Sequence, residues 1–315
     1  MTALLGEPTF CVRWHTASDQ GRVAHVQASG LVTGTDAATL GISLVRDGEC
    51  WRLCAEPRRE VVIDAVEATL PAALGEATAL YLNGYNSWTD SVERSPRDRM
   101  RNFSVPRVAI RHWVLDASGD YRFVEEDERP GHQHGFTYGY VRRDGEVALV
   151  GSLGEGTGMT LIREDLPAGV LLVGKEPPAV LVSAGDRCCL LGLAVVRAGS
   201  VDEAAGRWLA LCGIAAPPCS PLVGYTSWYR HYTDISEPCL LHDLDALADC
   251  LDDYDLGTRR PTFQMDDGYT RVGDWLQPDA EKFPHGLVAV AAAARERGLM
   301  PGIWVAPFVC ERESQ

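Results

Sequence analysis

One stretch of the sequence decides the fold: Thr262-Phe263-Gln264-Met265-Asp266-Asp267-Gly268-Tyr269. The four residues before the two carboxylates form a short run bounded by Pro261 and Gly268, which favours a β-strand over a helix. Burying two adjacent like charges without partners is costly, so a folded chain tolerates them mainly where they bind something polar or are solvated. The pattern is typical of a buried strand that delivers acidic side chains to the edge of a sheet.

Two further short runs predict neighbouring strands, one at 223–228 and one at 302–308. Between the three runs, apolar residues recur at helical spacing at 240–251 and again at 287–294. In the first of these helices Asp243 lies off the apolar stripe. The order strand, helix, strand, helix, strand predicts a parallel sheet with crossover helices, in which ligand groups gather beyond the carboxyl ends of the strands.

Five segments, in this order along the chain, resemble glycoside hydrolase family 36, the family of microbial α-galactosidases and related raffinose synthases. They are Gly224-Tyr225-Thr226-Ser227-Trp228, Asp266-Asp267-Gly268-Tyr269, Val272-Gly273-Asp274-Trp275, Lys282-Phe283-Pro284-His285-Gly286-Leu287 and Gly302-Ile303-Trp304. Each segment is weak alone, and jointly they are specific. Tyr225 and Thr226 stand where family members typically have Trp and Asn, which leaves the choice of substrate open.

The resemblance implies a large N-terminal β-sandwich at 1–199, a connecting helix and linker at 200–219, and the start of a (β/α)8 TIM barrel at 220–315. Many short apolar runs separated by turn residues agree with the sandwich, and Ser200-Val201-Asp202-Glu203 is a capping box that opens the connecting helix. A complete barrel takes roughly 250 residues. Three strands and two helices therefore imply an incomplete barrel and a truncated chain.

The resemblance also implies roles for residues at the predicted strand ends. Asp266 and Asp267 would bind hydroxyl groups of a terminal galactose, and Trp304 would pack against the apolar face of the sugar. Trp228 lies at the end of the first strand and joins them as a candidate. In the family the nucleophile and the acid/base are aspartates on later barrel strands, so no catalytic residue is expected before residue 315.

Other residues leave alternatives open. Trp275, after the second strand, either faces the substrate or packs within its loop. Trp88, in a segment that nearly repeats the first motif, either forms a wall of the sugar pocket or packs in a tight turn. His132 and His134 have the spacing of one strand face, but no carboxylate or cysteine lies at usual metal-ligand spacing, so no metal site is predicted. Lys282, before the second helix, is expected to be solvated.

Composition narrows the classes of function. The net charge of −15, from 44 acidic and 29 basic residues, argues against nucleic acid, whose phosphates require a basic face. No apolar run is long enough to cross a membrane, and the N-terminus does not have the pattern of a secretory signal. Ten scattered cysteines without a Cys-x-x-Cys pair indicate free thiols in a reducing compartment, so a cytoplasmic location is predicted.

The sequence therefore predicts an α-galactosidase-like retaining glycosidase that hydrolyses terminal α-D-galactosyl groups of oligosaccharides. The resemblance implies no metal or organic cofactor, and a homo-oligomer for the full-length protein. One alternative is a raffinose-synthase-like transferase, which would favour a sugar acceptor over water. Another is a non-catalytic sugar-binding fragment, because the chain alone is expected to be inactive.

Overall fold

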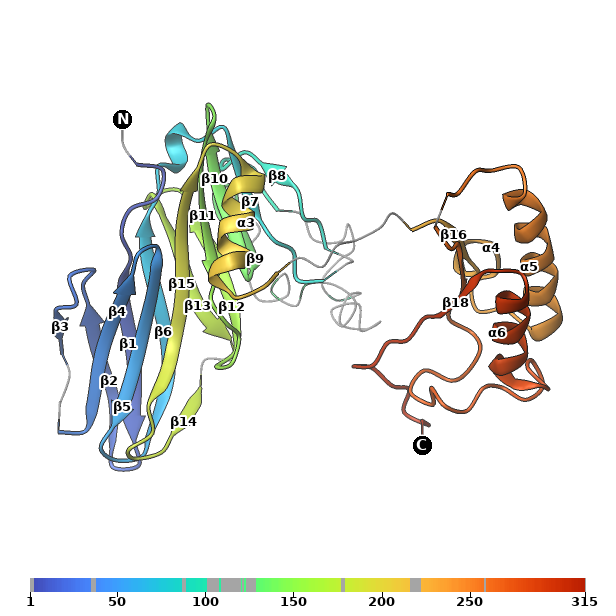
Figure 1. Ribbon diagram of the computed structural model, residues 1–315. Helices are drawn as coiled ribbons and strands as arrows, with labels where there is room; N and C mark the ends of the chain where they lie inside the picture. Colours follow the sequence, from blue (N-terminus) through green and yellow to red (C-terminus); the bar gives the residue numbers. More distant parts are fainter. Residues whose placement is uncertain are drawn as a thin grey trace. The chain divides into compact units, whose positions relative to one another are not determined.

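The computed structural model describes residues 3–34, 38–86, 89–100, 108, 120, 122, 129–176, 179–215, 222–257 and 259–314. The chain divides into two compact units, Met1–Ala215 and Ala216–Gln315 (Figure 1). The finer division at 1–199, 200–219 and 220–315 stays a prediction. No helix in the described ranges is long and apolar enough to cross a membrane.

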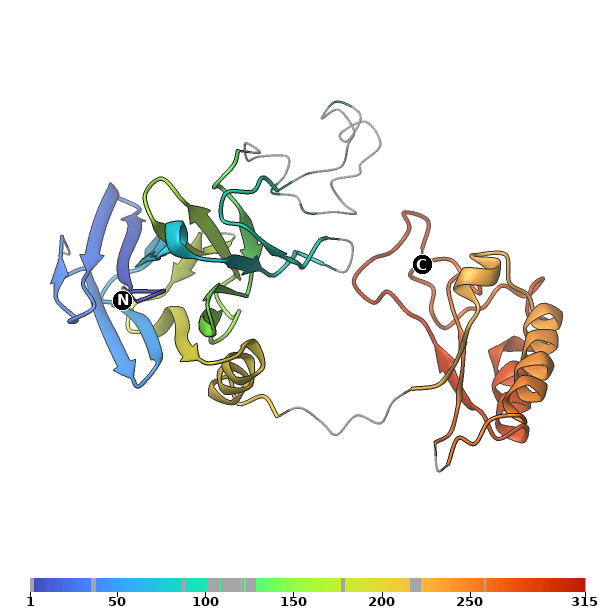
Figure 2. The ribbon, with the colours of Figure 1, turned by 90° about the horizontal axis from the view of Figure 1, so that it is seen from above.

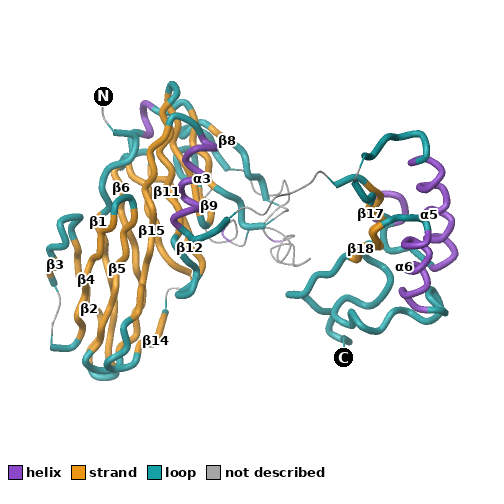
Figure 3. Tube along the Cα trace, in the orientation of Figure 1, coloured by secondary structure: helices purple, strands orange, loops and turns teal. Residues whose placement is uncertain are grey.

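The first unit is built from two antiparallel sheets (Figure 3). Among the described residues, one sheet has eight strands. Seven of them lie in the order β3 (Val32–Thr33), β2 (Asp19–Val26), β1 (Thr9–Thr16), β6 (Val61–Pro71), β13 (Val170–Glu176), β12 (Met159–Asp165) and β9 (His134–Phe136). The eighth, β14 (Val180–Val182), also pairs with β6. The seven described strands of the other sheet are, in order, β4 (Leu40–Asp47), β5 (Cys50–Pro57), β15 (Cys188–Ala198), β11 (Glu146–Ser152), β10 (Tyr138–Arg143), β7 (Ala79–Leu82) and β8 (Glu93–Arg94). A single 3₁₀ turn in these ranges, η1 (Leu74–Glu76), precedes β7.

The core of this unit lies between the two sheets. Alternate residues of β1 point inward, and Phe10, Val12 and Trp14 are buried, as expected for a half-buried strand of period two. They join one continuous apolar cluster with residues of the other sheet, such as Leu53 and Leu193. The predicted β-sandwich is therefore confirmed.

Helix α3 (Val201–Leu211) packs on the second sheet. The predicted capping box is present in part. The Ser200 side chain accepts a hydrogen bond from the Glu203 backbone N–H, while the Glu203 carboxylate accepts the N–H of Gly199. Trp208 fixes the helix, since its indole N–H donates to the carbonyl of Ser152 at 2.9 Å and its ring stacks on Tyr138. A Cβ atom at Gly151 would lie 2.4 Å from the Trp208 indole nitrogen, so this contact requires glycine.

The second unit has the predicted strands and crossover helices and one further short helix, α4: its elements are β16 (Gly224–Thr226), α4 (Trp228–His231), α5 (Glu237–Leu251), β17 (Thr262–Met265), α6 (Gly286–Glu296) and β18 (Met300–Ile303). The strands predicted at 223–228 and 302–308 differ in their bounds, because α4 begins at Trp228 and β18 ends at Ile303. The three strands are parallel, with β17 in the middle. Helices α5 and α6 cover the same face of this sheet (Figure 1, Figure 2). Phe263 and Met265 of β17 are buried in the core formed with these helices, while Gln264 points to the opposite face. The predicted parallel sheet with crossover helices is confirmed, and its place in a barrel stays a prediction.

Glu164 on β12 is a buried carboxyl group with incomplete hydrogen bonding. Its Oε2 accepts the Gln133 backbone N–H at 3.2 Å, and its Oε1 accepts no hydrogen bond among the described residues. Burial raises the pKa of Glu164 to about 8, and the charges of Asp98 and Asp165 add to the rise. Ionisation of this group is therefore opposed by the folded state.

We expect Glu164→Gln to remove a pH dependence of stability. Because the folded-state pKa of Glu164 is raised to about 8, the protonated carboxyl group contributes its full stability below the pKa of the unfolded state. This contribution is lost as pH rises toward 8. The free energy of unfolding of the variant, minus that of the wild type, should therefore increase between pH 5 and pH 8, by up to about 1.4 kcal/mol per pH unit. Urea denaturation across this range measures the gain. Glu56→Gln, at an exposed position on β5, is the control, and equal pH profiles for the three proteins would contradict the expectation.

Candidate functional site

The carboxyl ends of the three parallel strands meet at one edge of the sheet. Ser227 follows β16, Asp266 follows β17 and Trp304 follows β18. The hydrogen-bonding pattern continues past the strands, because the Trp304 backbone N–H donates to the Met265 carbonyl at 2.9 Å. This edge therefore collects two carboxylates, a hydroxyl group and an indole from segments far apart in the sequence.

Asp266 is held by polar groups that carry no charge. Its carboxylate Oδ2 accepts hydrogen bonds from the Thr226 hydroxyl at 2.8 Å and from the Gln264 side-chain amide at 2.9 Å. Its Oδ1 accepts the backbone N–H of Asp267 at 3.0 Å, and its own N–H donates to the Ser227 hydroxyl at 2.9 Å. Only 8% of Asp266 is exposed. The carboxylate is thus fixed in orientation, and sequence reasoning had not assigned Thr226, Ser227 or Gln264 to this task.

Asp267 lies in a different environment. It is half-buried, and its Oδ1 accepts the backbone N–H of Gly268 at 2.7 Å. It lines a cavity of about 360 Å³, whose walls also include Arg271, Lys282 and Glu311. Gly268 has a φ of +102°, and a Cβ atom there would lie 2.3 Å from the Thr233 carbonyl oxygen, so the turn after the acidic pair requires glycine. The two adjacent carboxylates therefore have separate surroundings.

Three aromatic side chains pack together beside the acidic pair. The rings of Trp275 and Trp304 meet edge to face at 5.9 Å, and Tyr269 lies 6.3 Å from Trp275. The Tyr269 hydroxyl donates to the Trp304 carbonyl at 3.1 Å. Burial, followed by the charge of Asp267, raises the pKa of Tyr269. The structure thus brings Trp275 against Trp304. This contact agrees with both alternatives for Trp275, which either faces the substrate or packs within its loop.

Of the other two predicted tryptophans, only Trp228 lies among the described residues. Trp228 begins α4, and its described ring contact is with Tyr232 at 5.3 Å. Trp88 lies outside the described residues, so its predicted role stays a prediction. Its neighbour Tyr85 packs edge to face on Phe136 in the first unit, with ring centroids 5.1 Å apart.

The loops around the cavity are tied by charged side chains. Lys282 was expected to be solvated, but its ammonium group donates to the carbonyls of Thr233 and Gly268, at 2.9 and 3.0 Å. Arg271 donates to the Glu313 carbonyl at 2.8 Å and lies 3.9 Å from the Glu311 carboxylate. These contacts join the loop after β17 to the segments after β16 and β18, which no local sequence pattern reveals.

Of the paired histidines of the first unit, His134 has a described side-chain partner. His134 Nε2 lies 2.7 Å from Asp120 Oδ2, and both side chains are buried. Asp120 precedes His134 by 14 residues, a spacing that the sequence-based search for metal ligands did not consider. The Asp120 carboxylate thus gives the buried His134 ring a polar partner.

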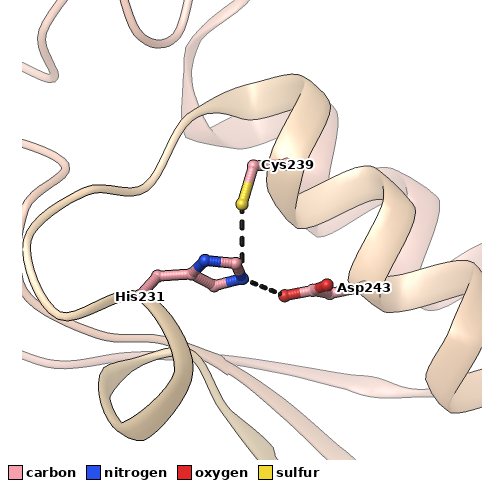
Figure 4. Close-up of side chains that lie close together, drawn as sticks. All are labelled: His231, Cys239 and Asp243. Carbon is pink, nitrogen blue, oxygen red and sulfur yellow. Dashed lines mark hydrogen bonds and ion pairs between the residues drawn. The ribbon is translucent and has the colours of Figure 1, made fainter.

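A second polar cluster lies on the helix side of β16, formed by His231, Cys239 and Asp243 (Figure 4). Asp243 lies off the apolar stripe of its helix, yet its side chain is only 1% exposed. The reason is tertiary, because the Tyr225 hydroxyl and the His231 ring both contact its Oδ2. Burial opposes ionisation of Asp243, but these hydrogen bonds and the charge of Arg230 hold its pKa below its ordinary value.

Solved structures similar to this chain are α-galactosidases of glycoside hydrolase family 36. No family model matches the sequence. TtGalA, an α-galactosidase from Thermus thermophilus, is 24% identical with a TM-score of 0.54, over 87% of this chain and 50% of that one. The AgaA and AgaB α-galactosidases from Geobacillus stearothermophilus give TM-scores of 0.55 and 0.51 at 14% and 15% identity, over 94% and 93% of this chain and 40% of each enzyme. The resemblance to family 36 is thus confirmed for the fold, and the chain spans 40 to 50% of the length of these enzymes.

We expect Ser227→Ala to destabilise the edge of the sheet. Ser227 is fully buried and its hydroxyl is the acceptor for the Asp266 backbone N–H, so the variant leaves that buried donor without a partner, at a cost of about 1–3 kcal/mol. Native-state hydrogen exchange of the β16–β18 amides measures the loss. Ser236→Ala is the matched control, because the Ser236 side chain makes no capping hydrogen bond and its loss should cost less than about 0.5 kcal/mol. Equal effects of the two substitutions would contradict this account.

Proposed function

We propose that this chain forms the sugar-recognition part of an α-galactosidase-like glycoside hydrolase that acts on terminal α-D-galactosyl groups of oligosaccharides. The observation that carries the proposal is the oriented carboxylate of Asp266, which stands beside Asp267 at the carboxyl end of β17. The neighbouring strand β18 ends at Trp304, whose backbone bonds to β17. Acidic acceptors beside an indole are the groups that recognise a pyranose.

The chemistry of a sugar fits the two environments. A carboxylate accepts strong hydrogen bonds from hydroxyl groups, and a carboxylate that is already oriented loses little freedom on binding. Asp267 supplies acceptor oxygens at the wall of the cavity. An aromatic face packs on the apolar C–H face of the ring while polar groups bind its rim. In this proposal Asp266, Asp267 and Trp304 bind the sugar, with Trp275 supporting the indole.

The three-stranded sheet is, in this proposal, the first part of a (β/α)8 barrel. Within the described residues, β16 and β18 each pair with β17 alone, and edges of a parallel sheet are normally paired or covered. Phe308, after β18, is 98% exposed, which supports a neighbour on this side. The nucleophile and the acid/base would be carboxylates of other barrel strands, so the two aspartates of this chain bind and do not react.

The comparisons support a galactoside as the ligand. TtGalA was solved with p-nitrophenyl α-D-galactopyranoside, and variants of AgaA were solved with 1-deoxygalactonojirimycin, stachyose and raffinose. These ligands belong to those enzymes. This chain is similar in fold to the part of those enzymes that it covers, and it offers carboxylates and an indole at the edge where a parallel sheet binds its ligands.

Galactose should bind this chain in preference to glucose. The two sugars differ at the C4 hydroxyl, and a site that hydrogen-bonds a particular hydroxyl discriminates against a sugar that lacks it there. Titration followed by tryptophan fluorescence should give a dissociation constant for galactose at least about tenfold lower than for glucose, because one hydrogen bond to a charged group contributes about 1.5–3 kcal/mol. Equal affinities, or no change in fluorescence with either sugar, would remove the support for galactose recognition.

We expect Asp266→Ala to lower turnover of an aryl α-galactoside in the enzyme that contains the complete barrel. The variant removes a charged acceptor from a buried site, so kcat/KM should fall on the order of 10²-fold or more. Asp267→Asn, which keeps the shape of the side chain, should also lower kcat/KM. Asp253→Ala, at an exposed position after α5, is the control and should retain full activity. A folded Asp266→Ala variant with wild-type kcat/KM would refute the assignment.

A further inference from the structure

Three side chains with different ligating atoms converge in the second unit. His231 Nε2 lies 2.6 Å from Asp243 Oδ2, and Cys239 Sγ lies 3.4 Å from the same nitrogen. The three ligating atoms all lie within 4.8 Å of one another. Figure 4 shows that the cysteine and the carboxylate approach the imidazole from α5, while the histidine comes from the segment before that helix. A nitrogen, a sulfur and an oxygen thus face one point.

The fold dictates this convergence. Cys239 and Asp243 are four residues apart on α5, so their side chains lie on one face of the helix, one turn apart. The same spacing places two metal ligands on one face of the helix in other metalloproteins. His231 is the last residue of α4. The turn after it leads the chain into α5, so that the imidazole faces this helix.

An ordinary hydrogen-bonded pair does not account for the geometry. The carboxylate and the thiol both approach Nε2, although one imidazole nitrogen either donates one proton or accepts one hydrogen bond. Asp243 Oδ1 is buried and accepts no hydrogen bond among the described residues. Its ion-pair partner, Arg230 Nη1 at 3.3 Å, belongs to a side chain that is 56% exposed. A cation among the three atoms would satisfy all of them.

We propose that His231, Cys239 and Asp243 bind a zinc ion. Zinc accepts nitrogen, thiolate sulfur and carboxylate oxygen together, whereas magnesium and calcium prefer oxygen alone. Zinc–ligand bonds of about 2.0–2.3 Å in tetrahedral geometry place the ligand atoms roughly 3.3–3.8 Å apart. The His231–Asp243 contact of 2.6 Å must therefore open by about 0.8 Å. The Tyr225 hydroxyl, which donates to Asp243 Oδ2, orients the carboxylate as outer-shell hydrogen bonds do in metal sites.

The role of this zinc ion is structural. It joins α4 to the first turns of α5, and a water molecule would fill the fourth position, which most structural zinc sites give to a protein ligand. Binding a metal whose ligands come together only in the folded chain stabilises that fold. The ion would therefore stabilise the connection that follows β16 and would not take part in sugar chemistry.

Zinc titration of the chain in the presence of a competing chelator tests the site. The wild type should bind one zinc ion with a dissociation constant at or below the micromolar range. Cys239→Ser should raise this constant at least about 100-fold, since even outer-shell substitutions cost about 10–100-fold. Cys250→Ser is the matched control, because this cysteine is exposed on the same helix, and it should bind zinc as the wild type does. Tyr225→Phe should weaken binding about tenfold.

Cobalt provides a readout of the ligand itself. Cobalt(II) bound by the wild type should show a sulfur-to-metal charge-transfer band that is absent in Cys239→Ser and retained in Cys250→Ser. If the Cys239→Ser chain fails to fold by circular dichroism, the wild-type spectrum alone decides, and a missing charge-transfer band overturns the proposal. Equal zinc affinity of the wild type and a folded Cys239→Ser variant, or no zinc binding by the wild type at micromolar concentrations, also overturns it.

Discussion

The parallel pairing of β17 with both β16 and β18 is the constraint on which the site depends. Because the three strands run in one direction, the residues that follow each of them emerge at one edge. An antiparallel β18 would carry Trp304 to the opposite edge from Asp266. The pairing in turn depends on the apolar face of the sheet, where Phe263 stacks on Tyr225 with ring centroids 5.1 Å apart beneath the helices.

The structure resolves the electrostatic problem that the sequence poses at residues 266 and 267. The two carboxylates do not compete for the same donors, because Asp267 accepts the backbone N–H of Gly268 and Asp266 accepts other groups. Asp266 is bonded by the neutral side chains of Thr226 and Gln264. Asp267 lines a cavity that Arg271 and Lys282 also line. Neutral donors for one acid and nearby positive charge for the other reduce the repulsion between them.

Helical spacing of apolar residues and short runs bounded by turn residues predicted the parts of the fold that depend on local sequence. The strand at 262–265, the helices before and after it, and the N-cap at Ser200 all appear in the structure. In each case the signal lies within a few residues, as apolar spacing or a capping hydrogen bond. The resemblance to family 36 added the sandwich, whose separate strand pairings no local pattern specifies.

Most of the contacts that sequence reasoning missed are distant along the chain, and the Gln264–Asp266 hydrogen bond, which spans two residues, is an exception. Asp243 is buried because Tyr225 and His231 reach it from another element, whereas helical periodicity assigned it only to the polar side. Asp120 meets His134 across 14 residues, and Lys282 reaches Thr233 across 49. A hydrogen bond between remote residues has no signature in spacing, so the partners of buried polar groups had to come from the structure.

The segment from Tyr225 to His231 links the two polar clusters of the second unit. Tyr225 donates to Asp243 on the helix side of the sheet, while Thr226 and Ser227 hold Asp266 at the strand ends. A metal ion at His231 and a sugar at Asp266 would therefore each order the same short piece of chain. Two ligands that order one segment favour each other's binding, because the segment that the first ligand has ordered loses less conformational entropy when the second binds. This coupling is equal in both directions. A zinc ion bound at the proposed site would thus raise sugar affinity without any contact between the ion and the sugar.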